Sequence, residues 1–198
     1  MSLKTFFQSA WREISGANDP IRIAAKSVRL AAKNKDQEKA RENFFSLLGK
    51  INPDDPKAAD LVLRDIIPFC RENLGTHFAC KMADAVYWRF WDNLFLGATL
   101  NSLRFELAKE AMNEAIEKGD RGAFVDAHEI YCQACNPLDK KVSTLWAKSI
   151  GLAIPKFGAT LVSRMVDEVR WNTPHGTPLR EEAVKARYSL CEDKPTAG

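Results

Sequence analysis

The sequence has no long hydrophobic run. Its longest nearly apolar stretch, Leu94 to Leu100, is far shorter than the roughly 20 residues that a helix needs to cross a bilayer. The N-terminus is amphipathic and does not place an apolar block after a charged segment, so we expect no secretory signal. These absences predict a soluble protein without a membrane span.

Cysteine and histidine are scarce. The five cysteines are an odd number, spread thinly along 198 residues, which argues against a disulfide framework and fits a reducing compartment. The predicted location is the cytoplasm. With only three histidines, a hydrolase site built from several histidines would have few ligands to use.

Motifs that mark common enzyme classes are also missing. The chain has no Gly-rich phosphate loop, no His-Glu-x-x-His, no Gly-x-Ser-x-Gly and no Glu-x-x-His, which are signatures of phosphate binding, zinc hydrolysis, serine hydrolysis and di-iron bundles. The sequence therefore gives no support to catalysis, and we expect no cofactor.

The sequence does contain a repeated helical pattern. Segments with a 3.6-residue apolar period are separated by Asp-Pro, Gly and Asn-Pro, without a convincing strand between them. With 45% hydrophobic residues, the chain can bury a core. We predict an all-α fold: a single-domain, irregular helical bundle of about nine helices, built from antiparallel helix hairpins over residues 1–191, with 192–198 as a frayed tail.

Turn and cap signals set the predicted boundaries. Asp19-Pro20 and Asp36 begin helices, and Asp55-Pro56 begins another that Pro68 should kink. We further expect one helix from Thr76 to Leu96, another from about 102 to 118, and a break at Pro155 in the helix that follows Asn136-Pro137.

The N-terminal quarter is basic. Residues 1–50 carry ten Lys and Arg against five Asp and Glu, whereas the other 148 residues carry nineteen against twenty-one. A first helix would place Phe6, Phe7 and Trp11 on one apolar stripe, and a second would align the basic residues Arg22, Lys26, Arg29 and Lys33. These seven residues are the predicted partner-binding surface.

The sequence favours another protein as the partner of this surface, which makes the chain an adaptor or regulatory module. The alternative is that the basic residues neutralise phosphates and that the protein regulates a nucleic acid. A solvated face of an amphipathic helix would show the same pattern. Partner identity and oligomeric state stay open.

A second alternative function rests on His128, Cys132 and Cys135. Their i, i+4 and i+7 spacing places an imidazole and two thiols on one side of a helix, and these are ligands that zinc and copper(I) prefer. The set could serve a metal- or redox-active protein. Buried cysteines in an ordinary core give the same pattern.

A third group lies in an aromatic segment. Asp84, Trp88, Arg89 and Asp92 combine charges with large rings, and charges in such surroundings are costly unless they are paired. The charged residues are expected to form a structural network between helices; otherwise the group lines a candidate ligand pocket.

Overall fold

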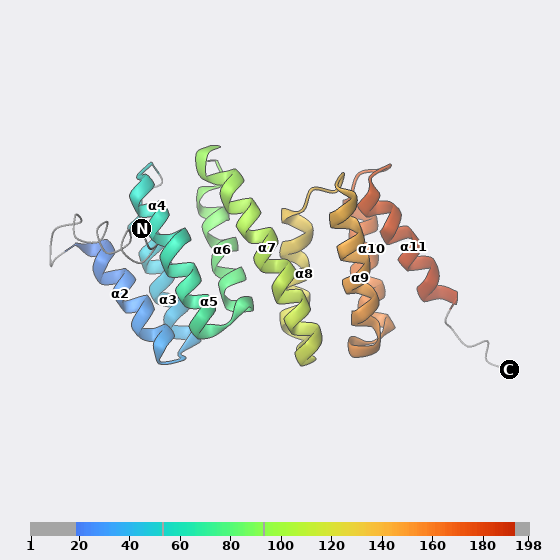
Figure 1. Ribbon diagram of the computed structural model, residues 1–198, viewed down its shortest axis with the longest axis horizontal. Helices are drawn as coiled ribbons and strands as arrows, with labels where there is room; N and C mark the ends of the chain where they lie inside the picture. The colour runs from blue at the N-terminus through green and yellow to red at the C-terminus, as the bar shows by residue number, and fades with distance from the viewer. Residues whose placement is uncertain (1–18, 53, 93, 193–198) are drawn as a thin grey trace, which may run out of the picture. The chain divides into compact units, whose positions relative to one another are not determined.

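The computed structural model describes residues 19–52, 54–92 and 94–192. These residues are helical without a strand, and they hold nine helices when α4, η1 and α5 are counted as one continuous helix. The predicted all-α class is thus confirmed, and antiparallel hairpins recur within it (Figure 1). No helix in this part of the chain is long and apolar enough to cross a membrane.

Backbone packing divides the chain into two compact units, residues 1–75 and 76–198, and each is described by itself. The single domain over 1–191 stays a prediction, and most of the expected tail, 193–198, lies outside the described residues.

Unit 1 is a helix hairpin packed against a longer, interrupted helix. It contains α2 (Pro20–Lys33), α3 (Gln37–Leu48), α4 (Pro56–Leu61), η1 (Val62–Ile66) and α5 (Ile67–Leu74). Small residues allow α2 and α3 to approach closely, because the buried side of α2 consists of four alanines and a valine. Phe44, Leu47 and Ile66 fill the space behind them and are completely buried.

Unit 2 contains two groups of packed helices. The first is α6 (Thr76–Phe90), α7 (Leu94–Lys118) and α8 (Arg121–Ala134), and the second is α9 (Lys140–Phe157), α10 (Ala159–Asn172) and α11 (Pro178–Glu192) (Figure 1). Trp146 of α9 is fully buried, and the Tyr131 hydroxyl of α8 donates a hydrogen bond to the Val142 carbonyl at 2.9 Å.

Aspartate side chains begin many of these helices. Each N-cap carboxylate accepts a hydrogen bond from a backbone N–H of the first turn, at 2.8 to 3.0 Å; the capping residues are Asp19, Asp36, Asp55, Asp120 and Asp139. Such caps satisfy N–H groups that have no partner inside the helix. The predicted starts at Asp19-Pro20 and Asp55-Pro56 are confirmed.

Two local predictions are corrected. The expected helix from Thr76 to Leu96 ends at Phe90 instead, because Asp92 favours a turn over a helix interior, and α7 begins at Leu94 and not at about residue 102. α9 runs through Pro155 and ends two residues later at Phe157, so the proline removes one backbone donor without ending the helix at its own position. Before Pro68, where a kink is expected, the helix widens into the π-helical turn η1, a distortion at which helices commonly bend.

Candidate functional site

The predicted basic row lies on α2, but its members differ in environment. Lys26 and Lys33 are exposed, whereas Arg22 and Arg29 are partly buried. The Arg29 guanidinium forms an ion pair with Asp65 of η1. The row is therefore divided into two exposed lysines and two arginines at the edge of the packed side of the helix.

Two large apolar residues share the exposed side of α2 with the lysines. Ile23 is 53% exposed and Leu30 is 60% exposed. They are seven residues apart, and each precedes a lysine by three positions, so the four side chains lie on one face. We call Ile23, Lys26, Leu30 and Lys33 the α2 face. The sequence analysis missed its apolar members, although the same 3.6-residue period that aligned the basic row could have identified them.

A cavity of about 300 Å³ adjoins the α2 face on the side of α3. Ile23 and Ala24 form part of its apolar wall, and Asn43 and Lys50 contribute polar groups. The Asn43 amide donates a hydrogen bond to the Ser27 carbonyl at 3.1 Å and so fixes this wall. An apolar side chain of a partner could enter the cavity beside the lysines.

Phe6, Phe7 and Trp11, the aromatic part of the predicted partner-binding surface, lie outside the described residues. Their role stays a prediction.

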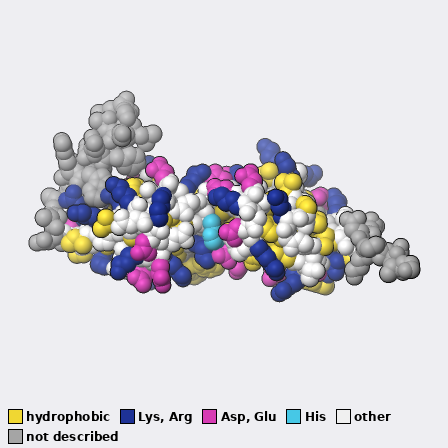
Figure 2. Space-filling model, turned by 90° about the horizontal axis from the view of Figure 1, so that it is seen from below, with side chains coloured by type: hydrophobic (Ala, Val, Ile, Leu, Met, Phe, Trp, Pro, Cys, Tyr) yellow, Lys and Arg dark blue, Asp and Glu magenta, His cyan; other side chains and the backbone are white. Residues whose placement is uncertain are grey.

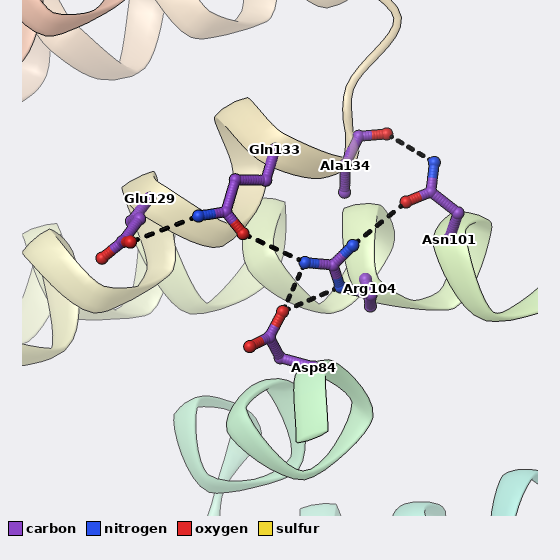
Figure 3. Close-up of polar contacts among 6 residues, drawn as sticks. All are labelled: Asp84, Asn101, Arg104, Glu129, Gln133 and Ala134. Carbon is purple, nitrogen blue, oxygen red and sulfur yellow. Dashed lines mark hydrogen bonds and ion pairs between the residues drawn. The ribbon is translucent and has the colours of Figure 1, made fainter. Parts of the chain in front are cut away.

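In unit 2, the dominant polar feature is a buried arginine. Arg104 of α7 is only 1% exposed, and its guanidinium binds the Asp84 carboxylate of α6, with an Nε–Oδ1 distance of 2.9 Å. Its other nitrogens donate to the side-chain oxygens of Asn101 and Gln133, each at 3.3 Å (Figure 3). The Arg104 guanidinium carbon also lies 4.0 Å from the centre of the Tyr87 ring. The guanidinium of Arg104 therefore connects α6, α7 and α8.

This arrangement corrects the predicted network. Asp84 does bind an arginine, but the arginine is Arg104, while Arg89 and Asp92 are exposed. Trp88 is 56% exposed. The sequence could not identify Arg104, because its partner lies twenty positions earlier on another helix.

Asp84 and Trp88 do line a cavity, of about 220 Å³. The carboxylate of Asp126 on its wall contacts the Lys81 ammonium at 2.7 Å and the His77 ring at 3.2 Å. The Asp126 pKa is lowered, since these two neighbours outweigh the opposing effect of burial. Asp84 and Asp126 therefore have cationic partners in this cavity, whereas Glu129 on its wall accepts a hydrogen bond from the Gln133 amide at 3.2 Å.

His128 is part of the core of unit 2. It is 2% exposed, and its Nε2 atom accepts a hydrogen bond from the Trp146 indole at 3.0 Å. Burial lowers the pKa of His128 to about 4. The ring is therefore neutral at physiological pH, and the nitrogen lone pair that a metal would need is directed at Trp146.

The two nearby thiols do not complete a metal site with His128. The Cys132 sulfur lies 3.6 Å from His128 Nε2, whereas Cys135 donates to the Cys132 carbonyl. Burial raises the pKa of Cys135 to about 11 and that of Cys132 well above its ordinary value. Within the described ranges, no group of three or more His, Cys, Asp and Glu side chains could hold a metal ion.

A groove of about 440 Å³ lies beside His128 and Cys132, between α8 and α10. Val125, Met165 and Val169 give it apolar walls, and Glu129 and Glu168 stand at its polar side. The size suits a small ligand. However, neither the neutral histidine nor the protonated thiols provide a reactive group at neutral pH.

Comparison of the chain with protein-family models, curated proteins and solved structures gives no match. Its function must therefore be argued from the faces and cavities described above.

The buried arginine gives a first prediction. Replacing Arg104 with alanine leaves Asp84 without its cation and removes a guanidinium that three helices share. We expect the free energy of unfolding, measured by urea denaturation, to fall by about 3 kcal/mol. The matched variant Arg89→Ala, on an exposed side chain, should change it by less than about 0.5 kcal/mol. Equal losses in the two variants would contradict the assignment.

The buried histidine predicts a pH dependence of stability. In the unfolded chain His128 takes up a proton below its ordinary pKa of 6.5, whereas in the folded protein it stays neutral down to about 4. The contribution of His128 to the free energy of unfolding is therefore complete above the unfolded pKa of 6.5 and is lost as the pH falls toward 4. Between about pH 7 and pH 5, the free energy of unfolding should fall by roughly 2 kcal/mol because of this histidine. In His128→Gln, the loss over this range should be smaller by that amount; an unchanged pH profile would show that the ring is not held neutral.

The thiols predict a simple reactivity pattern. Cys191 is exposed, whereas Cys70 and Cys80 are buried and have pKa values raised to about 11 and about 12. A thiol reagent at neutral pH should modify one cysteine of the native protein quickly and all five in denaturant. The variant Cys191→Ser should lose the fast reaction. A fast reaction at Cys132 or Cys135 would instead favour the redox alternative.

Proposed function

We propose that this chain is a non-enzymatic protein–protein interaction protein, an adaptor or regulator, which binds its partner on the α2 face. One observation carries the proposal: Ile23 and Leu30 remain more than half exposed on a helix that contains four basic and no acidic residues. Exposed apolar side chains rimmed by charges of one sign are typical of contact surfaces.

The geometry of the α2 face suits a helical or extended protein segment. Its two apolar residues are two turns apart, which is the spacing at which an amphipathic partner helix places its own apolar side chains. The adjoining cavity of about 300 Å³ offers a place for one anchoring side chain. Lys26 and Lys33 would attract a partner with carboxylates at the rim.

A protein partner explains the α2 face better than a nucleic acid does. Phosphate binding would use the whole basic row, but Arg29 already neutralises Asp65. It would also give no role to Ile23 and Leu30. The cytoplasm remains the proposed location, since all five cysteines are free.

The test compares one variant of the α2 face with a control of equal charge change. The variant Lys26→Glu/Leu30→Asn/Lys33→Glu and the control Lys39→Glu/Lys57→Glu alter exposed positions of the same unit. Each protein captures partners from its native host, and a recovered partner is then purified and titrated. We expect the variant to weaken binding of that partner at least tenfold and the control to leave it unchanged. A partner that binds all three proteins equally well would contradict the proposal.

A further inference from the structure

A second helix, in unit 2, exposes the same kind of surface. On α9, Leu145 and Leu152 are 43% and 50% exposed, and Lys141 and Lys148 are exposed beside them. We call these four residues the α9 face. The opposite side of α9, with Trp146 and Ile150, is buried in the core of the unit. On the face of unit 2 that Figure 2 shows, hydrophobic side chains gather over the C-terminal helices.

Three residues of the α9 face repeat three residues of the α2 face in sequence. Residues 25–31 read AKSVRLA and residues 147–153 read AKSIGLA, with five of the seven positions identical. The alignment pairs exposed residues with exposed ones: Ile23 with Leu145, Lys26 with Lys148, and Leu30 with Leu152. It also pairs buried Val28 with buried Ile150. Both helices therefore turn an aliphatic–lysine–aliphatic pattern toward solvent, while the second lysine of each face, Lys33 or Lys141, has no counterpart in this alignment.

Charge distinguishes these two helices from the others. α2 and α9 each contain four basic residues and neither contains Asp or Glu, whereas every other helix in the described ranges has at least one acidic residue. The chain as a whole has 26 acidic residues. Carboxylates are thus missing from the two helices that expose pairs of large aliphatic residues, and the chemistry complementary to both faces is apolar and acidic.

We propose that the α9 face is a second docking surface and that it binds the same class of partner as the α2 face: an amphipathic protein helix with acidic residues beside its apolar stripe. The shared partner class rests on the proposed function of the α2 face. Leu145 and Leu152 contact the apolar stripe of the partner helix, and Lys141 and Lys148 pair with its carboxylates. A chain with two such faces binds two acidic helices, or one partner that carries both.

A protein helix fits the α9 face better than an anionic membrane does. A helix that lies on a membrane buries a broad apolar side among the lipids. The broad apolar side of α9 is already occupied by the core of unit 2, where Trp146 and Ile150 are inaccessible. Two aliphatic residues on a single row remain, which is the width that one partner helix covers.

The probe for the test is a labelled synthetic helix with leucines at i, i+3 and i+7 and glutamates on both sides of them. Its binding to the full chain is followed by fluorescence anisotropy and by calorimetry, which gives the number of sites. The α9 variant is Leu145→Asn/Leu152→Asn, and the α2 variant is Ile23→Asn/Leu30→Asn. Tyr188→Asn, at a side chain that is 68% exposed elsewhere on unit 2, is the control. Helicity and thermal unfolding confirm that each variant folds.

We expect two sites in the native protein, one in each of the two variants, two in Tyr188→Asn and none when the two variants are combined. At each altered face the affinity of the probe should fall at least tenfold. In the native protein, the affinity of both faces for the probe should fall as salt rises. A single site in the native protein that only the α2 variant removes would overturn the inference about α9 and leave the proposed function intact. A single site that only the α9 variant removes would support docking on α9 and overturn the shared partner class, while the native partner still decides the proposed function of the α2 face.

Two further results would overturn the inference about α9. One is no saturable binding of the probe, or binding that neither variant changes; the proposed function is then still decided separately by the native partner. The other is binding of the chain to phosphatidylserine vesicles that the α9 variant abolishes, together with no binding of the probe. That result would assign the α9 face to a membrane.

Discussion

The rotation of each helix about its own axis is the constraint on which the surfaces of this protein depend. On α2, five small apolar residues are buried against the rest of unit 1, and a helix has only one rotation that buries such a stripe. Ile23 and Leu30 lie off that stripe and are therefore turned outward, although each is larger and more hydrophobic than the alanines that are buried. The exposure of these two side chains is thus a consequence of packing elsewhere on the same helix.

Charge is used in two opposite ways in this fold. Inside unit 2, Arg104 is withdrawn from water but keeps an acidic partner and two amide oxygens (Figure 3), and it also lies against the Tyr87 ring. This set of contacts offsets the cost of burial and ties α6, α7 and α8 together.

On the outer faces of α2 and α9, lysines remain in water without any acidic residue on their own helix. Charges of the first kind position helices, and charges of the second kind are available for another molecule.

In the candidate sites, residues that fit a functional sequence pattern have environments that do not suit that function. His128 and Cys132 have the spacing of metal ligands, yet the Trp146 indole occupies the histidine nitrogen and burial keeps the thiol protonated. Arg29 has the spacing of a phosphate-binding row, yet it neutralises Asp65. In both cases the deciding partner comes from another helix, which a periodic pattern within one helix cannot reveal.

The sequence by itself determined the helical class and most helix starts, because caps, prolines and apolar periodicity act over a few neighbouring residues. It did not determine that Asp84 binds Arg104 instead of Arg89, that His128 is neutral, or that α9 exposes Leu145 and Leu152. Only the tertiary structure decided these features. Ion pairing, desolvation and exposure depend on which helices come together, and side chains that meet across helices are distant in sequence.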